Sequence, residues 1–473
     1  MHLKSQKYQT MKDNKAQITD ILYEKQRAFF ASQSTQSTAF RIKQLKALRK
    51  EIASMERDIF DALHKDLRKS SFEAMTSETV LVEKEIGKMV QMLPLWNRPR
   101  RAKSSLINFP SRDYIIPEPY GNTLIISPWN YPFQLAVAPM IGAIAAGNTV
   151  VLKPSEFAPH TAKVIREIVE NVFDPGHVAV VEGDAAVATQ LLKKRWDFIM
   201  FTGSTSVGKI IAKAAAEHLT PTTLELGGKS PCIVDETAPL GITAKRLVWG
   251  KFLNCGQTCI APDYLLVQHK VKAALTTKII QEIESTFGIK QQQSKDYGRI
   301  VHKKHFDKLK KSLQNHSIIY GNQTDENDLY LGPTLVNNPA PDSELMQEEI
   351  FGPILPIIGY EKEEEIHKLL EGRERPLAFY VFSKREKFID RLFKRYSFGG
   401  GVANDSIIQF ANDNLPFGGI GHSGMGAYHG HYSFKNFSHE KPVIKRAFWF
   451  DLPGRYAPYP KSLSLLKFLL KKL

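Results

Sequence analysis

Cysteine is scarce in this chain, with three residues among 473: Cys232, Cys255 and Cys259. Three thiols are too few for a disulfide framework, and this favours a reducing compartment. Cys255 and Cys259 lie four residues apart, but no second cysteine or histidine pair follows at ligand spacing nearby. His429 and His431 likewise have no carboxylate or third histidine close by. We therefore expect no metal site.

Long apolar runs are also missing. The first 24 residues are polar and dotted with lysine, without the apolar core of a signal peptide. The most membrane-like run, 135–152, contains Pro139 and Gly147, which favours a buried helix leading into a strand over a span. The last residues, 463–473, are apolar and basic but shorter than a span. We expect a cytoplasmic protein, whose tail either docks on its own chain or touches an anionic membrane surface weakly.

Acidic residues are outnumbered, 49 against 64 basic ones, which gives a formal charge of +15. This excess favours acidic ligands without choosing among them. Much of it lies in runs at 98–103, 303–311 and 467–472, with no RNA-binding aromatic motif or zinc-finger spacing nearby. We interpret these runs as solvated faces and expect no nucleic-acid partner.

Strand-like and helix-like segments alternate over much of the chain, after amphipathic helices at 16–90 and an extended, proline-rich segment at 94–119. The alternation predicts parallel sheets covered on both faces by helices. In the first region we expect strands at 123–126, 149–152, 178–181 and 198–201, with helices at 133–146, 161–172 and 185–192. In the second we expect strands at 231–234, 264–267, 351–360, 377–382 and 401–403, a helix running through Cys255, and a basic helix at 302–313.

Ligands of such sheets bind beyond the carboxyl ends of the strands, so the residues that follow the strands are candidates for function. Lys153 and Glu156 follow one strand; they are either surface charges or groups that bind the ribose and phosphate of a nucleotide. Asn130 follows another strand, next to Trp129, and its side chain offers an NH₂ donor to the same crevice.

A glycine-rich turn at 203–209, GSTSVGK, matches most of a P-loop. It fails at Ile210, where a magnesium-binding serine or threonine is required, although an NTP-binding enzyme stays open as an alternative. A glycine turn that opens a helix suits any phosphate group, and it is also a common structural turn. The GIGHSG segment at 419–424 follows no strand, so we reject it as a dinucleotide fingerprint.

Cys259 lies in the segment NCGQTCI at 254–260, with Glu225 upstream in LELGG at 224–228. A thiol among glycine and small polar residues can act as a nucleophile, with backbone N–H groups available to a developing oxyanion and a carboxylate as base. The alternative is an inert cysteine that serves as a small buried hydrophobe.

Eight segments in order carry a resemblance that decides between these alternatives. They are PWNYP at 128–132, KPSE at 153–156, FTGS at 201–204, LELGG at 224–228, GQTCIAPD at 256–263, EEIFGP at 348–353, PFGG at 416–419 and SGMGAYHG at 423–430. With them the chain resembles an aldehyde dehydrogenase, most nearly the class 3 branch that acts on fatty or aromatic aldehydes. The resemblance implies NAD(P)-dependent oxidation of a medium- or long-chain aliphatic or aromatic aldehyde to the acid, through a thiohemiacetal and a thioester.

The resemblance also implies a role for each candidate residue. Cys259 is the nucleophile, Asn130 and the Cys259 backbone N–H hold the oxyanion, and Glu225 activates the hydrolytic water. NAD or NADP would be bound by Trp129, Lys153, Glu156, Gly203, Ser204, Thr205, Ser206, Val207, Gly208, Leu226, Glu349 and Phe351. Glu156 is expected to disfavour a 2′-phosphate, yet the class 3 branch often accepts both cofactors. A catalytically silent relative would have lost the cysteine, the glutamate or the asparagine, and this chain has all three.

The implied fold is α/β, with a Rossmann-like cofactor domain, an α/β catalytic domain and a small β arm. The expected division is 1–97 and 120–224 for the NAD(P)-binding domain, 225–427 for the catalytic domain, 98–119 and 428–447 for the oligomerisation arm, and 448–473 for the tail. The resemblance implies a homodimer that associates through the arm.

Overall fold

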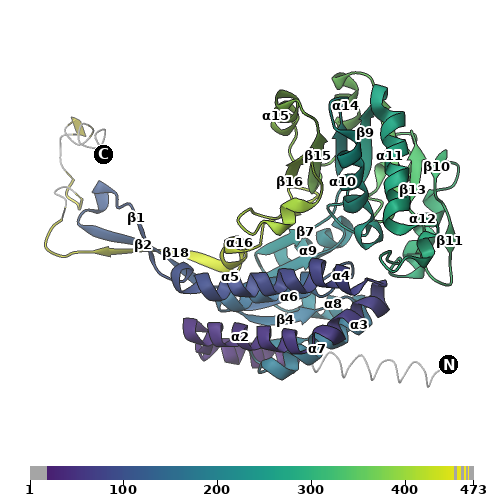
Figure 1. The fold of residues 1–473 in the computed structure, drawn as a ribbon. Coiled ribbons are helices and arrows are strands. Elements are labelled where there is room, and N and C mark those ends of the chain that lie inside the picture. Colours follow the sequence, from purple (N-terminus) through teal and green to yellow (C-terminus); the bar gives the residue numbers. More distant parts are fainter. Residues whose placement is uncertain (1–18, 452–454, 460–462, 465–466, 468–473) are drawn as a thin grey trace.

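The computed structural model describes residues 19–451, 455–459, 463–464 and 467. It contains two α/β units and a thin β arm that projects from them (Figure 1). The α/β class, the alternation and the arm are thus as predicted. Most of the tail after residue 460 lies outside the described residues, and with it the predicted membrane contact. No described helix is long and apolar enough to cross a bilayer.

The first sheet has six strands in the order β17-β7-β6-β3-β4-β5. Their bounds are β3 (Asn122–Ile126), β4 (Thr149–Lys153), β5 (Val178–Val180), β6 (Phe198–Thr202), β7 (Thr222–Glu225) and β17 (Gly424–Met425). All neighbours are parallel except β17, which runs antiparallel to β7. In this register Ile126 lies beside Lys153, and Thr202 beside Glu225. The strand exits that the sequence marked therefore lie along one edge.

Helices cover this sheet on both faces. They are α6 (Gln134–Ala146), α7 (Pro159–Val172), α8 (Ala185–Leu192) and α9 (Thr205–Ala216), with α2 (Thr38–Ser54), α3 (Glu56–Leu67) and α5 (Val80–Trp96) as an outer layer. Every residue of α6 is buried, because α2 and α5 pack over it. A short helix, α4 (Ser71–Ala74), and a π-helical turn, η2 (Met75–Thr79), join α3 to α5. The amphipathic helices predicted before residue 90 are confirmed from residue 19 onward.

The second sheet has seven strands in the order β10-β13-β14-β9-β8-β15-β16. They are β8 (Pro231–Val234), β9 (Tyr264–Gln268), β10 (Ile318–Tyr320), β13 (Thr334–Asn337), β14 (Ile354–Tyr360), β15 (Ala378–Phe382) and β16 (Gly400–Ala403). Its helices are α10 (Leu240–Phe252), α11 (His269–Phe287), α12 (Lys303–Ser312), α13 (Glu344–Gln347), α14 (Glu363–Leu370) and α15 (Glu386–Arg395). Only β10 is antiparallel to its neighbour. A small hairpin, β11 (Thr324–Asp325) with β12 (Tyr330–Leu331), lies beside this unit.

Two expectations for this unit were wrong. The helix predicted through Cys255 ends at Phe252, because Asn254 and Cys255 have left-handed backbone angles (φ 51° and 55°) and residues Leu253–Gly256 form a short 3₁₀ turn, η4. The strand predicted from Phe351 begins at Ile354, since Phe351 also has a positive φ of 56°.

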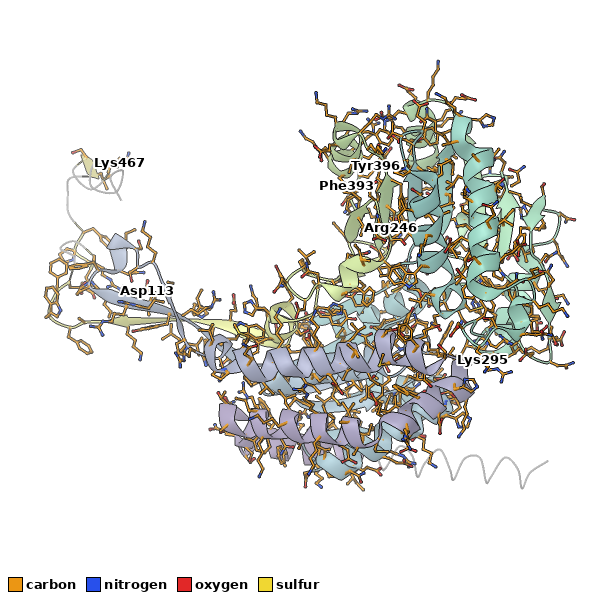
Figure 2. The ribbon with its side chains drawn as sticks, viewed as in Figure 1. Asp113, Arg246, Lys295, Phe393, Tyr396 and Lys467 are labelled. Atoms are coloured by element: carbon orange, nitrogen blue, oxygen red, sulfur yellow. The ribbon has the colours of Figure 1, made fainter. Side chains whose placement is uncertain are left out.

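The arm is a three-stranded antiparallel sheet, β1 (Arg100–Ala102), β2 (Ser111–Pro119) and β18 (Ser438–Arg446). The helix α16 (His431–Asn436) leads into β18 from the body. Figure 2 shows Asp113 on this arm, far from Arg246 and Phe393 in the second unit. The division into domains stays a prediction; we note that β17 of the first sheet comes from the predicted catalytic segment.

Candidate active site

The loop that bears Cys259 runs between η4 and β9, and glycine makes its path possible. Gly256 has a φ of +74°, and a Cβ there would lie 2.3 Å from the main-chain oxygen of Gly352. The turn therefore packs directly on the segment that carries Phe351. The left-handed angles of Asn254 and Cys255 are unusual for residues with side chains, and such strain is common next to functional groups.

Cys259 and Glu225 line one narrow cavity, which has about 60 Å³ of free space. Cys259 is partly exposed to it, whereas Cys232 and Cys255 are buried. Burial raises the pKa of the Cys259 thiol well above its usual range, and the nearby Glu349 and Glu225 raise it further. The backbone N–H groups of Cys259 and Ile260 act in the opposite direction. These surroundings favour the protonated thiol, which must lose its proton to react.

Asn130 is joined to the same loop by hydrogen bonds. Its side-chain Nδ2 donates to the Gln257 carbonyl at 3.0 Å, and its own carbonyl accepts from Asn254 Nδ2 at 2.7 Å. Asn130 is 2% exposed, and its amide carries a second N–H. The structure thus brings the predicted oxyanion donor and the predicted nucleophile's loop together across the two units.

Glu225 ends strand β7 and is 2% exposed. Within the described part of the chain, neither of its carboxyl oxygens has a hydrogen-bond partner. Burial alone raises the pKa of this carboxyl well above its ordinary range. A buried carboxyl of this kind is a candidate proton acceptor, and it takes up a proton from water more readily than an exposed one.

Several of the residues predicted to bind the nucleotide lie at the adjoining strand ends. Lys153 Nζ lies 2.7 Å from Glu156 Oε2. Helix α9 begins at Thr205, with Ser204 as its N-cap, so the glycine turn delivers a helix N-terminus as expected. Gly208 lets the first turn of α9 pack closely on Leu226, since a Cβ would lie 2.6 Å from Leu226 Cδ2.

The side chains of Thr205, Ser206 and Val207, in the first turn of α9, differ in their contacts. The Thr205 hydroxyl donates to the His422 carbonyl at 3.0 Å, and Ser206 Oγ lies 3.1 Å from Ser204 Oγ. Val207 is 41% exposed, as a surface for a flat apolar ligand would be. Thr205 therefore fixes a neighbouring loop, while the Val207 side chain is exposed.

Glu349 lies against the backbone at 227–228, and Phe351 packs against Trp129. The Gly228 N–H bonds to the Glu349 carboxyl, and burial, followed by nearby Asp263, raises the pKa of Glu349 to about 8. A Cβ at Gly227 would lie 1.9 Å from Glu349 Oε2, so glycine allows that approach. The Phe351 and Trp129 rings meet edge to face at 5.3 Å. Thr205, Gly227 and Glu349 line a wide cleft of about 910 Å³.

Two residues at the site were given no role from the sequence. Tyr131 lines the cavity, and its hydroxyl lies 2.6 Å from Thr258 Oγ1. His305 Nε2 hydrogen-bonds the Phe351 carbonyl at 2.8 Å, although its helix looked like a solvated basic face. Burial lowers the pKa of His305 to about 4, so it is neutral at physiological pH.

Comparison with known proteins bears directly on this geometry. Residues 3–443 match the model of the aldehyde dehydrogenase family. The chain belongs to this family. A 4,4′-diaponeurosporen-aldehyde dehydrogenase of Staphylococcus aureus is 44% identical to it, over 94% of this chain and 97% of that protein. Aldehyde dehydrogenase family 3 member A2 of Mus musculus is 43% identical, over 94% and 93%.

Further relatives agree with these. A rat enzyme named "aldehyde dehydrogenase, dimeric NADP-preferring" is 42% identical, over 92% of this chain and 97% of that protein. A solved structure of the substrate-bound state of Staphylococcus aureus AldH superimposes with a TM-score of 0.93, covering 96% of this chain and 99% of that one at 43% identity. The fold and class predicted from the sequence are confirmed, and the protein is an NAD(P)-dependent aldehyde dehydrogenase. The P-loop alternative is set aside.

Proposed function

We propose that this aldehyde dehydrogenase oxidises medium- or long-chain aliphatic, or aromatic, aldehydes. The observation that supports this is the cavity in which Cys259 and Glu225 meet. Apart from these two and the polar Ser77, Gln134, Thr202, Thr258 and His429, its walls are apolar or aromatic, including Tyr131, Leu135, Phe410, Phe417 and Tyr428. Such walls favour an extended apolar substrate over a small hydrated one. The Staphylococcus aureus relative is named for 4,4′-diaponeurosporen-aldehyde.

In the first half of the proposed reaction, Cys259 Sγ attacks the carbonyl carbon of the aldehyde. The thiol proton leaves, and the carbonyl oxygen gains the negative charge of a thiohemiacetal. The second N–H of the Asn130 amide and the Cys259 backbone N–H stabilise that charge, as donors placed before the reaction do. A covalent intermediate on sulfur divides one difficult oxidation into two easier steps.

The wide cleft lined by Thr205, Gly227 and Glu349 fits a nicotinamide dinucleotide. Near it are a helix N-terminus for the phosphates at Ser204, the side chains of Lys153 and Glu156 at a strand exit, and the Glu349 carboxyl against glycine backbone. Bound NAD or NADP would supply the hydride acceptor that oxidation of the thiohemiacetal to a thioester on Cys259 requires. We propose that Lys153 and Glu156 bind the adenosine ribose, that Gly203 to Gly208 and Leu226 form the pyrophosphate side, and that Glu349, Phe351 and Trp129 hold the nicotinamide end.

In the second half, Glu225 takes a proton from the water that attacks the thioester carbonyl. The carbon–sulfur bond breaks, the acid leaves, and the Cys259 thiol is restored. Because the Glu225 carboxyl has no described partner and a raised pKa, it is a stronger base than an exposed glutamate once it is ionised.

A plate assay tests the substrate and cofactor proposals together. Formation of reduced nicotinamide would be measured for aliphatic aldehydes of increasing length and for benzaldehyde, each with NAD and with NADP. We expect kcat/KM to rise with chain length, because each buried CH₂ adds about 0.8 kcal/mol of apolar burial. We expect turnover with both cofactors, since Glu156 is already engaged by Lys153 at 2.7 Å. A preference for acetaldehyde over every longer substrate would contradict the substrate proposal.

We also propose that the enzyme is a homodimer joined through the arm. Strand β18 is an edge of the arm sheet and β16 an edge of the second sheet, so both leave a row of backbone N–H and C=O groups unpaired within the described chain. The name of the rat relative describes a dimer. The mass of one chain is 53.5 kDa, and light scattering on the full chain should give twice that mass. Ile444→Pro, which removes an outward-facing backbone N–H of β18, should shift the mass towards the monomer, whereas a parent that is already monomeric would refute the proposal.

A further inference from the structure

A buried ion pair contacts the segment of Asn130 and belongs to a part of the chain to which we have given no role in the reaction. Lys69 lies between α3 and α4, and Glu78 lies in the turn η2. Lys69 Nζ is 2.5 Å from Glu78 Oε1, and both side chains are 0% exposed. Burying two charges is expensive, and a hydrophobic pair of the same volume would often be at least as stable. Overall stability alone therefore does not account for the pair.

The remaining hydrogen bonds of the pair all go to one segment, residues 130–134. Lys69 Nζ donates to the Asn130 carbonyl at 3.1 Å and stands 4.0 Å from the centre of the Tyr131 ring. Glu78 Oε2 accepts from the backbone N–H groups of Phe133 and Gln134, both at 2.9 Å. These are N–H groups at the start of α6, which have no partner within the helix. The ion pair thus forms hydrogen bonds with the main chain both before and after Tyr131.

The catalytic loop holds the same segment from the opposite direction. Asn254 Nδ2 donates to the Asn130 carbonyl at 2.7 Å, and Tyr131 OH lies 2.6 Å from Thr258 Oγ1. A second carboxylate of the same N-terminal region, Glu73, accepts from the Asn254 backbone N–H at 3.0 Å. The main chain of Asn130 is therefore fixed between the ion pair and the loop of Cys259.

We propose that Lys69 and Glu78 are positioning residues, which hold the Asn130 main chain so that its side-chain amide faces the oxyanion formed at Cys259. This inference rests on the proposed role of Asn130. Neither residue of the pair touches the substrate; they act through Asn130. A displacement of about 1 Å in such a donor is enough to cost on the order of a hundredfold in rate.

The test is a double-mutant cycle on kcat/KM for one aldehyde. Asn130→Ala alone should lower kcat/KM by about 10² to 10³-fold. Lys69→Met combined with Glu78→Gln removes both charges of the pair and keeps similar volumes, so neither partner is left charged without the other, and it should cost about tenfold to a hundredfold. In the Asn130→Ala background the same pair of changes should cost little more, because the donor that they position is already gone. Alkylation of Cys259 by iodoacetamide forms no oxyanion and should proceed at the parent rate.

A control removes another ion pair, between the buried Asp235 and the half-exposed Arg385 of the second unit, which are 2.8 Å apart. Asp235→Asn with Arg385→Met should change kcat/KM equally in both backgrounds. The same additive behaviour for the Lys69–Glu78 variant would overturn the proposal. If that variant does not fold, Glu78→Asp keeps the charge but shortens the reach; a folded Glu78→Asp enzyme with the parent kcat/KM would also overturn it. If Asn130→Ala itself has no effect, the proposed function of Asn130 fails and the positioning role falls with it.

Discussion

Replacing Cys259 with alanine is expected to abolish aldehyde oxidation with every aldehyde and with either cofactor. Removing a covalent nucleophile typically lowers turnover by about 10⁴-fold or more. No other described cysteine lines the cavity, since Cys232 and Cys255 are buried in the hydrophobic cores of the second unit. The measurement is absorbance of reduced nicotinamide under saturating aldehyde, accompanied by a titration of cofactor binding, which should be unchanged.

The matched control for this substitution is Cys255→Ala. Cys255 is a buried thiol four residues away that does not line the cavity, so an aldehyde does not reach it. Cys255→Ala should keep most of the activity, and Cys259 should still be alkylated in that variant. Turnover in Cys259→Ala equal to the parent would refute the covalent mechanism, and loss of activity in both variants would point to the conformation of the loop instead.

Sequence patterns were sufficient to predict the edge of the first sheet. The strands at 149–152 and 198–201 were expected to be parallel, and parallel strands place their carboxyl ends at one edge. That rule alone put Asn130, Lys153 and Ser204 near one another, and the register of β3, β4 and β6 confirms it. The role predicted for each residue came from eight motifs in order, because a single glycine turn or a single cysteine has several ordinary explanations.

The parts that the sequence did not predict depend on contacts between distant segments. Lys69 and Glu78 lie more than 50 residues before Asn130, and no local spacing connects them. The turn at Asn254 and Cys255 looked helical because the apolar residues before it continue a helical period. Tertiary contacts prevail there: the Asn254 backbone N–H bonds to Glu73, and Gly256 lies against Gly352. The raised pKa of Glu225 likewise reflects burial, which a sequence window does not report.

Glu225→Gln is expected to stop turnover after one cycle. If Glu225 activates the water, the steps up to the thioester remain and its hydrolysis slows by about 10² to 10⁴-fold, the usual contribution of a general base. Rapid mixing should therefore show a burst of one reduced nicotinamide per active site, followed by a slow steady state. Mass spectrometry of the quenched protein should find the acyl group on the peptide that contains Cys259. Glu85→Gln, a change at another buried carboxyl with a raised pKa that does not line the cavity, should show no burst.

The rate of thioester hydrolysis should depend on pH through the ionisation of Glu225. The Glu225 pKa is raised by burial, so the carboxylate is the minor form at low pH and its fraction grows as the pH rises. Hydrolysis in the parent should accelerate with pH over that range, while the slow steady state of Glu225→Gln should lack this dependence. A variant that loses the burst as well would show that Glu225 instead takes the thiol proton of Cys259. A variant with parent turnover at every pH would assign the base to Glu349, the other carboxyl whose charge raises the Cys259 pKa and whose own pKa of about 8 suits that task.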